Sequence, residues 1–319
     1  MKRYQCKDCL QWFSIDYRKK NNSVIEDHLD GKPIRKIADK EKKSKSSINR
    51  KLTEQIKNLP HNNSITKKYC NRFCGIMVAD GKYVKVRGYE KAIPLLWGID
   101  YLTHDVPVYD LAPSENYQSW LKYFGYLKSI NYPLKIVICD DNENIKTAAK
   151  YIFSNVVIQT CQNHFMENIR RDLHTRTEDK YKSFVIELKQ ELFSRKITKQ
   201  DFKIRALKLC KKYKNDQIKT ACLIKIDKAF EELTAATLVP QAPRDTNLIE
   251  LYNSHLQARL KSIKGFKSFV SAEKWLNAYI LRRRFRPFRD CSRKFRYLNG
   301  KASISQTCRK NGDLPLLFI

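Results

Sequence analysis

The chain lacks any apolar run that approaches the roughly 18–20 residues of a membrane-spanning helix. It also lacks an apolar secretion segment after Met1. Acidic residues are scarce, with 33 Asp and Glu against 63 Lys and Arg in 319 residues. These absences predict a cytoplasmic protein that contacts no membrane and carries a net charge of +30.

The excess of basic residues indicates the chemical class of the binding partner. A positive charge of this size, spread along a folded chain, favours a polyanion, because released counterions then drive binding. Charge alone does not separate DNA from RNA, and a lysine-rich genome is the simpler explanation. The composition is globular, at 42% hydrophobic and 11% aromatic residues. The length is enough for two or three domains with a substantial core.

The ten cysteines do not have the spacing of a small disulfide framework. Cys6 and Cys9 have the C-x2-C spacing of half a zinc knuckle. A structural Zn²⁺ needs four ligands, and the next pair, Cys70 and Cys74, lies about sixty residues away. We predict a partial zinc-knuckle-like segment over residues 1–15. The alternatives are a stray pair or a knuckle whose other half precedes Met1.

Residues 21–60 have the pattern of three short helices. Apolar residues recur at helical spacing in each, and Asp30-Gly31-Lys32-Pro33 marks a turn after the first. Asn49, Arg50 and Lys51 lie on the third, where a recognition helix would contact a DNA groove. We predict a helix-turn-helix DNA-binding domain, with a generic helical bundle as the alternative.

The pattern changes to strands after a polar linker at residues 60–73. Apolar runs predict strands at 75–87 (continuous or bent), 93–100, 106–111, 135–139 and 156–159. Helices are predicted after the third and fourth of these strands. Three strands, a helix and then strand, helix, strand is the order of an RNase H-like α/β domain. We predict this mixed sheet over residues 74–164, completed by 245–287.

Residues 165–244 separate the two parts of the predicted core. The stretch 165–236 is lysine-rich and contains no proline or glycine, which predicts an all-helical insertion. Two more helices are predicted within 246–286. Residues 288–319 form a weakly patterned C-terminal tail.

Three carboxylates in different local settings are the candidate catalytic residues. Asp80 and Asp140 each end an apolar run, and Glu250 begins an amphipathic segment. On adjacent strands and a helix packed against them, they would hold two Mg²⁺ or Mn²⁺ ions for phosphoryl transfer on a nucleic-acid backbone. Each also has a simpler explanation: a turn at Asp80-Gly81, a helix cap at Asp140, and a capping box from Asn247 to Glu250.

Cys161 and His164 follow the last predicted strand with C-x2-H spacing. Two ligands do not make a closed zinc site. We expect both residues to support the carboxylates, with His164 near the scissile phosphate. A buried thiol and a core histidine are the alternative.

Basic side chains near the predicted core complete the set of candidate DNA contacts. Arg259 and the run Arg282, Arg283 and Arg284 would line a DNA channel. For any single one of these arginines, exposure on a solvated helix face is the simpler interpretation.

Three blocks of sequence carry a resemblance to a known family. The first is Asp80-Gly81-Lys82-Tyr83-Val84-Lys85-Val86-Arg87. The second runs from Asp140 to Ala149 and continues in Gln159, Cys161, His164 and Asn168. The third contains Thr246, Asn247, Glu250, Asn253, Leu256, Arg259, Gly265 and Phe266. Together, over about residues 75–285, they resemble Mutator-like transposases and their bacterial insertion-sequence relatives.

This resemblance implies a DDE transposase of the RNase H-like superfamily with a helical insertion before the glutamate. It implies that Asp80, Asp140 and Glu250 are the metal ligands. Asp141 competes with Asp140, and we prefer Asp140 because it directly ends the strand. The chain departs from the insertion-sequence pattern by lacking the first cysteine pair of the N-terminal region.

The implied activity is binding of element ends, then metal-dependent cleavage and strand transfer on double-stranded DNA. Water is the first nucleophile, and no covalent protein intermediate is needed. Assembly on two ends implies at least a homodimer, associated with the nucleoid if the source is prokaryotic. The alternatives are a domesticated or decayed transposase that binds DNA without catalysis, and another RNase H-like nuclease.

Overall fold

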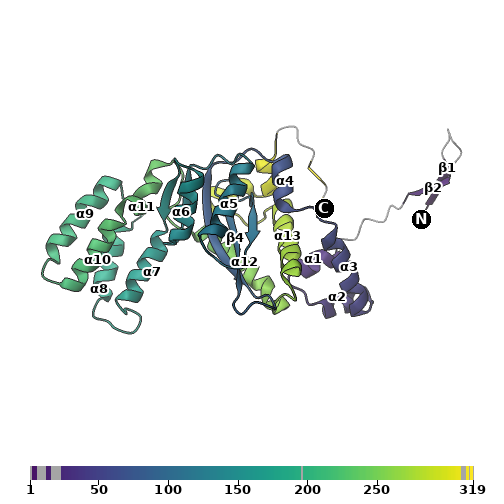
Figure 1. Ribbon diagram of the computed structural model, residues 1–319, viewed down its shortest axis with the longest axis horizontal. Coiled ribbons are helices and arrows are strands. Elements are labelled where there is room, and N and C mark those ends of the chain that lie inside the picture. Colours follow the sequence, from purple (N-terminus) through teal and green to yellow (C-terminus); the bar gives the residue numbers. More distant parts are fainter. Residues whose placement is uncertain are drawn as a thin grey trace.

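The computed structural model has a five-stranded sheet between a helical body and a three-helix unit (Figure 1). It describes residues 2–5, 12–15, 23–194, 197–309, 314–315 and 317–318. The strand order is β5-β4-β3-β6-β7. The strands are β3 (Ile76–Val84), β4 (Ile93–Asp100), β5 (Tyr109–Leu111), β6 (Ile136–Cys139) and β7 (Val157–Thr160). The predicted α/β class is confirmed.

The sheet is mixed, as predicted. β3 pairs antiparallel with β4 and β4 with β5, whereas β3, β6 and β7 run parallel to one another. β3 continues through Asp80 and Gly81, and Asp80 lies opposite Trp97 of β4. The strand is therefore continuous here, one of the two forms predicted for residues 75–87, and Asp80 ends the apolar run but not the strand. The alternative of a turn at Asp80-Gly81 is wrong. A Cβ at Gly81 would lie 2.7 Å from Glu115 Oε2, so a larger residue there would displace the Glu115 side chain.

Alternation along the strands decides which helices face the two aspartates. The helices on the two faces are α5 (Tyr117–Ser129), α6 (Glu143–Ile152), α12 (Asn247–Ile263) and α13 (Phe269–Phe285). Ala79 packs in the core formed with α5 and α6, whereas Ile138 packs in the core formed with α12 and α13. Asp80 follows Ala79 by one residue and Asp140 follows Ile138 by two. Both carboxylates therefore belong to the α12 side of the sheet.

The predicted helical stretch is a body at one end of the molecule (Figure 1). It comprises α7 (Gln162–Asp172), α8 (Lys182–Leu192), α9 (Lys199–Lys212), α10 (Gln217–Lys228), α11 (Phe230–Thr234) and the short 3-10 helix η1 (Ala235–Leu238). Its helices share an apolar core of their own, centred on Phe184, Leu188, Phe202 and Ile226. Helical structure begins at Gln162, directly after β7, slightly earlier than predicted.

The three predicted N-terminal helices are present as α1 (Ser23–Leu29), α2 (Ile34–Glu41) and α3 (Lys45–Lys57). The predicted linker at 60–73 is wrong, because it contains α4 (Asn62–Tyr69). Asn62 and Thr66 are fully buried polar residues that bind Arg284, which the polar composition did not indicate. At the N-terminus, β1 (Lys2–Gln5) pairs antiparallel with β2 (Trp12–Ile15).

Ion pairs join α1 to α13 at the opposite end from the helical body. Arg282 donates to both carboxylate oxygens of Asp30 at 2.7 Å, and Arg286 donates to Glu26 at 2.6 Å. The apolar residues of α1 to α3 belong to the same core as α12 and α13. The three-helix unit is therefore packed directly on the core.

A buried ion pair holds the C-terminal segment. Arg284 and Asp105 have fully buried side chains, and two hydrogen bonds of 2.7 Å join them. Ser303 and Thr307 donate to the same carboxylate at 3.0 and 2.6 Å. The predicted tail thus contains ordered elements, η2 (Arg293–Leu298) and α14 (Ser303–Thr307).

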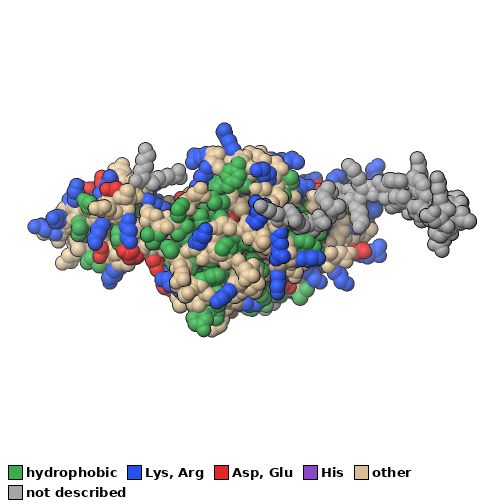
Figure 2. Space-filling model, turned by 90° about the horizontal axis from the view of Figure 1, so that it is seen from above, with side chains coloured by type: hydrophobic (Ala, Val, Ile, Leu, Met, Phe, Trp, Pro, Cys, Tyr) green, Lys and Arg blue, Asp and Glu red, His purple; other side chains and the backbone are tan. Residues whose placement is uncertain are grey.

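Basic side chains spread widely over the surface. On the face shown in Figure 2, Lys and Arg side chains extend from end to end, while Asp and Glu gather mainly on the helical body. No helix in the described parts of the chain is both long and apolar enough to span a bilayer.

Candidate active site

Two neighbouring parallel strands bring the first two carboxylates together. Ile76 of β3 lies opposite Ile136 of β6, and the register continues through Val78 and Ile138. Asp80 and Asp140 each lie four residues beyond the first of these pairs, so they lie at the same level of the sheet. β6 ends at Cys139 and the chain then turns into α6, while β3 continues. The turn after Cys139 gives Asp140 access to the edge of the sheet.

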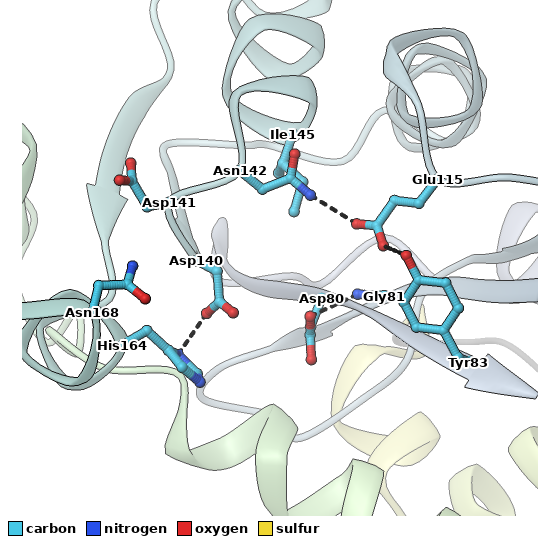
Figure 3. Close-up of a pocket in the computed structure, with 10 residues that line it drawn as sticks. All are labelled: Asp80, Gly81, Tyr83, Glu115, Asp140, Asp141, Asn142, Ile145, His164 and Asn168. Carbon is cyan, nitrogen blue, oxygen red and sulfur yellow. Dashed lines mark hydrogen bonds and ion pairs between the residues drawn. The ribbon is translucent and has the colours of Figure 1, made fainter. Parts of the chain in front are cut away.

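Both aspartates point into one cavity of about 400 Å³ (Figure 3). Its lining includes Asp80, Asp140, His164, Glu115 and Tyr83. The cavity is lined mainly by polar groups, so it is a place for an ion or a phosphate rather than an apolar ligand.

The Asp80 carboxylate is held from two sides. Oδ1 accepts the backbone N–H of Gly81 at 2.8 Å, and Oδ2 accepts Asn253 Nδ2 at 2.6 Å. Asn253 is fixed in turn by Trp97 Nε1, which donates to its Oδ1 at 3.1 Å. Burial, followed by the nearby Asp140 charge, raises the pKa of Asp80 to about 7. Asp80 is thus well oriented but lacks a positive partner.

His164 supplies the positive charge beside Asp140. Its Nδ1 lies 2.6 Å from Asp140 Oδ1, and its Nε2 lies 3.8 Å from Glu250 Oε1. The contact with Asp140 raises the pKa of His164 to about 11, which favours the protonated ring when no metal ion is bound beside it. The short contact is not aligned as a hydrogen bond, and buried Asp140 Oδ1 has no hydrogen-bond partner among the described residues.

Thr246 connects the C-x2-H pair to the glutamate. Its hydroxyl lies 2.7 Å from Glu250 Oε1, 3.1 Å from Cys161 Sγ and 3.1 Å from His164 Nδ1. Thr246 and Cys161 are both buried. Thr246, rather than Asn247, precedes the first residue of α12, and no side-chain cap forms there. The capping-box alternative for Glu250 is therefore not formed, and Glu250 is oriented toward the His164 side of the site.

Asp141, the competitor of Asp140, is held by another residue. Lys146 is almost fully buried and makes ion pairs with Asp141 at 2.5 Å and with Glu232 of α11 at 2.8 Å. Figure 3 shows the Asp141 side chain directed away from Asp140. The helix cap at this turn is Asn142, whose side chain accepts Asn144 N–H at 3.0 Å. Both aspartates line the cavity, but Asp141 is already paired with a lysine, whereas Asp140 faces His164.

Glu115 is a fourth carboxylate in the cavity that the sequence analysis missed. It accepts hydrogen bonds from Tyr83 at 2.7 Å, Asn142 at 2.9 Å and Trp120 at 3.2 Å. These bonds tie β3, α5 and the turn after β6 together beside the aspartates (Figure 3). Glu115 precedes α5 in a polar stretch, and nothing in its local pattern distinguishes it from a surface residue.

The donor set suits a cation. The raised pKa of Asp80 reflects burial and repulsion from Asp140, and a bound positive ion would relieve both. The ligand atoms of Asp140, Cys161 and His164 also lie within 4.8 Å of one another, so this group could itself hold a metal ion. Cys6 and Cys9, the predicted zinc pair, lie outside the described residues.

The predicted DNA-contacting residues separate into two sets. Asn49 and Arg50 are exposed on α3 and Lys51 is partly exposed, whereas Arg259 is partly buried on α12. Arg284 has no exposed surface, so the prediction that it contacts DNA is wrong.

The other two arginines of the run also bind within the protein. Arg282 is paired with Asp30, and Arg283 stacks 4.5 Å from the Tyr252 ring centroid. The run Arg282–Arg284 therefore joins α13 to its neighbours and does not form an open channel.

Comparison with known proteins fits this geometry. The family described as "Transposase, Mutator family" matches residues 32–284, so the chain belongs to the Mutator family of transposases. Among curated proteins, it is 26% identical over 288 residues to the transposase for insertion sequence element IS256 in transposon Tn4001 from Staphylococcus aureus. The same identity holds for the transposase of that name from Enterococcus faecalis. Each alignment covers 81% of this chain and 68% of the relative.

Proposed function

We propose that this chain is a DDE transposase that binds the ends of its element and catalyses metal-dependent DNA cleavage and strand transfer. The observation that carries the proposal is the meeting of Asp80 and Asp140 in one cavity. Glu250 is not among the residues that line this cavity, but its Oε1 lies 3.8 Å from Nε2 of His164, which does line it. Family membership supports the same conclusion. Three antiparallel strands followed by two parallel ones is the arrangement expected of an RNase H-like core, with α7 to η1 as its helical insertion.

The carboxylates Asp80, Asp140 and Glu250 would hold Mg²⁺ or Mn²⁺, hard cations that prefer oxygen ligands. Two such ions, when bound, activate a water or a 3′-hydroxyl and stabilise the leaving oxygen. The chain's own residues position the ligands: Asn253 orients Asp80, and Thr246 orients Glu250. His164, 2.6 Å from Asp140, would stabilise the Asp140 charge when protonated, and it would contact the scissile phosphate.

Double-stranded DNA is the proposed partner, as both element end and target. The three-helix unit would bind the end through the exposed face of α3, which carries Asn49, Arg50 and Lys51. Arg259 would contact the backbone near the cut. Cys6 and Cys9 remain the proposed zinc pair. Two ends in one complex require at least a dimer, working in the cytoplasm on nucleoid DNA if the source is prokaryotic.

The test is cleavage of DNA that carries the flanks of the gene, with Mg²⁺ or Mn²⁺, by wild type, Asp80→Asn and Asp140→Asn. We expect nicks at discrete flank positions that both substitutions remove while DNA binding remains. Equal loss of binding and cleavage would overturn the assignment of these residues. Flank binding by a wild type that does not cleave would favour a decayed transposase used as a DNA-binding protein. Cleavage without preference for the flanks would favour another RNase H-like nuclease.

A further inference from the structure

A second cavity lies next to the proposed active site. It has a volume of about 260 Å³ and is lined by residues from the end of β3, the C-terminal half of α12 and the segment that follows it. Tyr83 lines both this cavity and the one that contains Asp80 and Asp140. The two cavities are therefore neighbours that share one aromatic side chain.

The walls of this cavity are fixed by backbone hydrogen bonds. Phe266 N–H donates to Lys85 carbonyl oxygen, and Arg87 N–H donates to Phe266 carbonyl oxygen, both at 2.8 Å. Gly265 makes the approach possible, because its φ of +128° is unfavourable for other residues. The Tyr83 hydroxyl is held by Glu115 at 2.7 Å, although half of the residue's surface is exposed. The recess is thus built before any ligand arrives.

The chemistry of the lining combines an aromatic ring with positive charge. Lys85, Lys261 and Lys264 line the cavity and are exposed. None of the three forms an ion pair within the described part of the chain, unlike Arg282 and Arg284. Gln257 adds an amide that can both donate and accept hydrogen bonds.

We propose that this cavity binds one unpaired nucleotide of the DNA strand whose scissile phosphate occupies the neighbouring site. The proposal rests on the proposed function and adds a substrate contact to it. The cavity is smaller than the roughly 300–1,000 Å³ of pockets for drug-sized ligands, which suits a single base. A base enters such a recess only when it leaves the duplex stack, and an aromatic side chain then replaces its stacking partner. The lysines would bind the flanking phosphates.

The test is a double-substitution cycle between Tyr83 and the DNA base. An abasic nucleotide is moved across the positions next to the mapped cut in flank DNA, and wild type is compared with Tyr83→Ala. At one position we expect the abasic nucleotide to slow wild-type cleavage about tenfold or more, the size of a base-aromatic stacking contact. The same abasic nucleotide should then have little further effect on Tyr83→Ala. Losses that multiply, or no sensitive position in a cleaving wild type, would overturn the proposal.

Two control variants distinguish loss of the stacking contact from general damage to the protein. Tyr83→Phe retains the ring and loses the bond to Glu115, so the abasic nucleotide should slow it by the same factor as wild type, whatever its own cleavage rate. Tyr151→Ala removes an exposed tyrosine that lines neither cavity and should leave cleavage unchanged.

A binding experiment separates this proposal from the proposed function. Tyr83→Ala and the abasic nucleotide are combined again in Asp140→Asn protein, in which no cleavage is expected. The dissociation constant for DNA is measured for each combination. Coupling in binding would support the nucleotide pocket even if wild type failed to cut. The absence of coupling, or of DNA binding altogether, would count against the pocket. Lys261→Gln should also lower the slope of log affinity against log salt by about one phosphate contact.

Discussion

Asp105 and Asp80 are both largely removed from water, but their carboxylates have opposite surroundings. Around Asp105, burial alone would raise the pKa, but Arg284 outweighs burial and holds the pKa below its usual range. Ser303 and Thr307 bond the same carboxylate. Asp80 has neutral hydrogen-bond donors only, and burial together with Asp140 raises its pKa to about 7.

The difference separates a carboxylate that is satisfied within the fold from one that we propose binds a metal ion. A buried carboxylate with a guanidinium and two hydroxyl donors needs nothing further. The Asp140 charge raises the pKa of Asp80 across the shared cavity, and a bound cation would relieve that repulsion. Substitutions at the two centres should therefore have opposite consequences for stability and activity.

The largest effect on activity should come from Asp140→Asn. Loss of a ligand charge removes several kcal/mol of transition-state stabilisation, so cleavage should fall at least about a thousandfold. Rates on flank DNA measure this effect. Thermal unfolding should change little, because the substitution removes both the repulsion toward Asp80 and the ion pair with His164. A large loss of stability would make Asp140 a structural residue like Asp105.

The largest effect on stability should come from Arg284→Met. It leaves the Asp105 charge buried and unpaired, which costs about 3–5 kcal/mol in the free energy of unfolding. Urea denaturation measures the change. Arg289→Met, at an exposed arginine nearby, is the matched control and should cost almost nothing. Recovery of stability in Arg284→Met with Asp105→Leu would identify the unpaired charge as the cause.

Thr246→Val should have an intermediate effect that is confined to activity. The substitution keeps the shape of the side chain but removes the hydroxyl that bonds Glu250. We expect about a tenfold slower cleavage and a higher Mg²⁺ concentration at half-maximal rate, as for other residues that orient metal ligands. Thr237→Val, at an exposed threonine, is the control. Unchanged metal dependence would argue against the positioning role.

The smallest effect concerns pH. The folded-state pKa of Asp80, about 7, lies above its unfolded value of about 4. The contribution of Asp80 to stability is therefore fully present below pH 4 and is lost as pH rises through 7. Asp80→Asn carries no such charge. We subtract the Tm of wild type from the Tm of Asp80→Asn at each pH. This difference should be about 2–5 °C larger at pH 8 than at pH 5. Mg²⁺ should reduce this difference at pH 8, and a pH-independent difference would contradict the interpretation.

Sequence patterns predicted most of the secondary structure because its signals are local. The apolar run at 93–100 has the bounds of β4, and helical spacing identified α1 to α3. α4 was missed because its buried residues, Asn62 and Thr66, are polar and are satisfied by a residue about 220 positions away in the chain. A composition-based pattern does not contain such a partner.

The candidate site was predictable in part because some of its residues also have local sequence signals. Asp80 and Asp140 follow recognisable apolar runs, and the family-like blocks drew attention to Glu250. Glu115 and the Thr246 contacts depend on tertiary neighbours that leave no periodic signal. The run Arg282–Arg284 was wrongly predicted to contact DNA, because the sequence does not reveal whether a charged side chain points to solvent or into the protein. Its partners Asp30 and Asp105 are far away in sequence.

The attachment of α1 to α13 fixes the distance between the three-helix unit and the sheet. The three-helix unit shares a core with the sheet, and α4 occupies the stretch that would otherwise have been a tether. Bases read by α3 and the phosphate beside Asp140 would then be separated by a length that the fold determines. Successive base pairs advance by about 3.4 Å, so one protomer would cut at a constant number of base pairs from its recognition sequence.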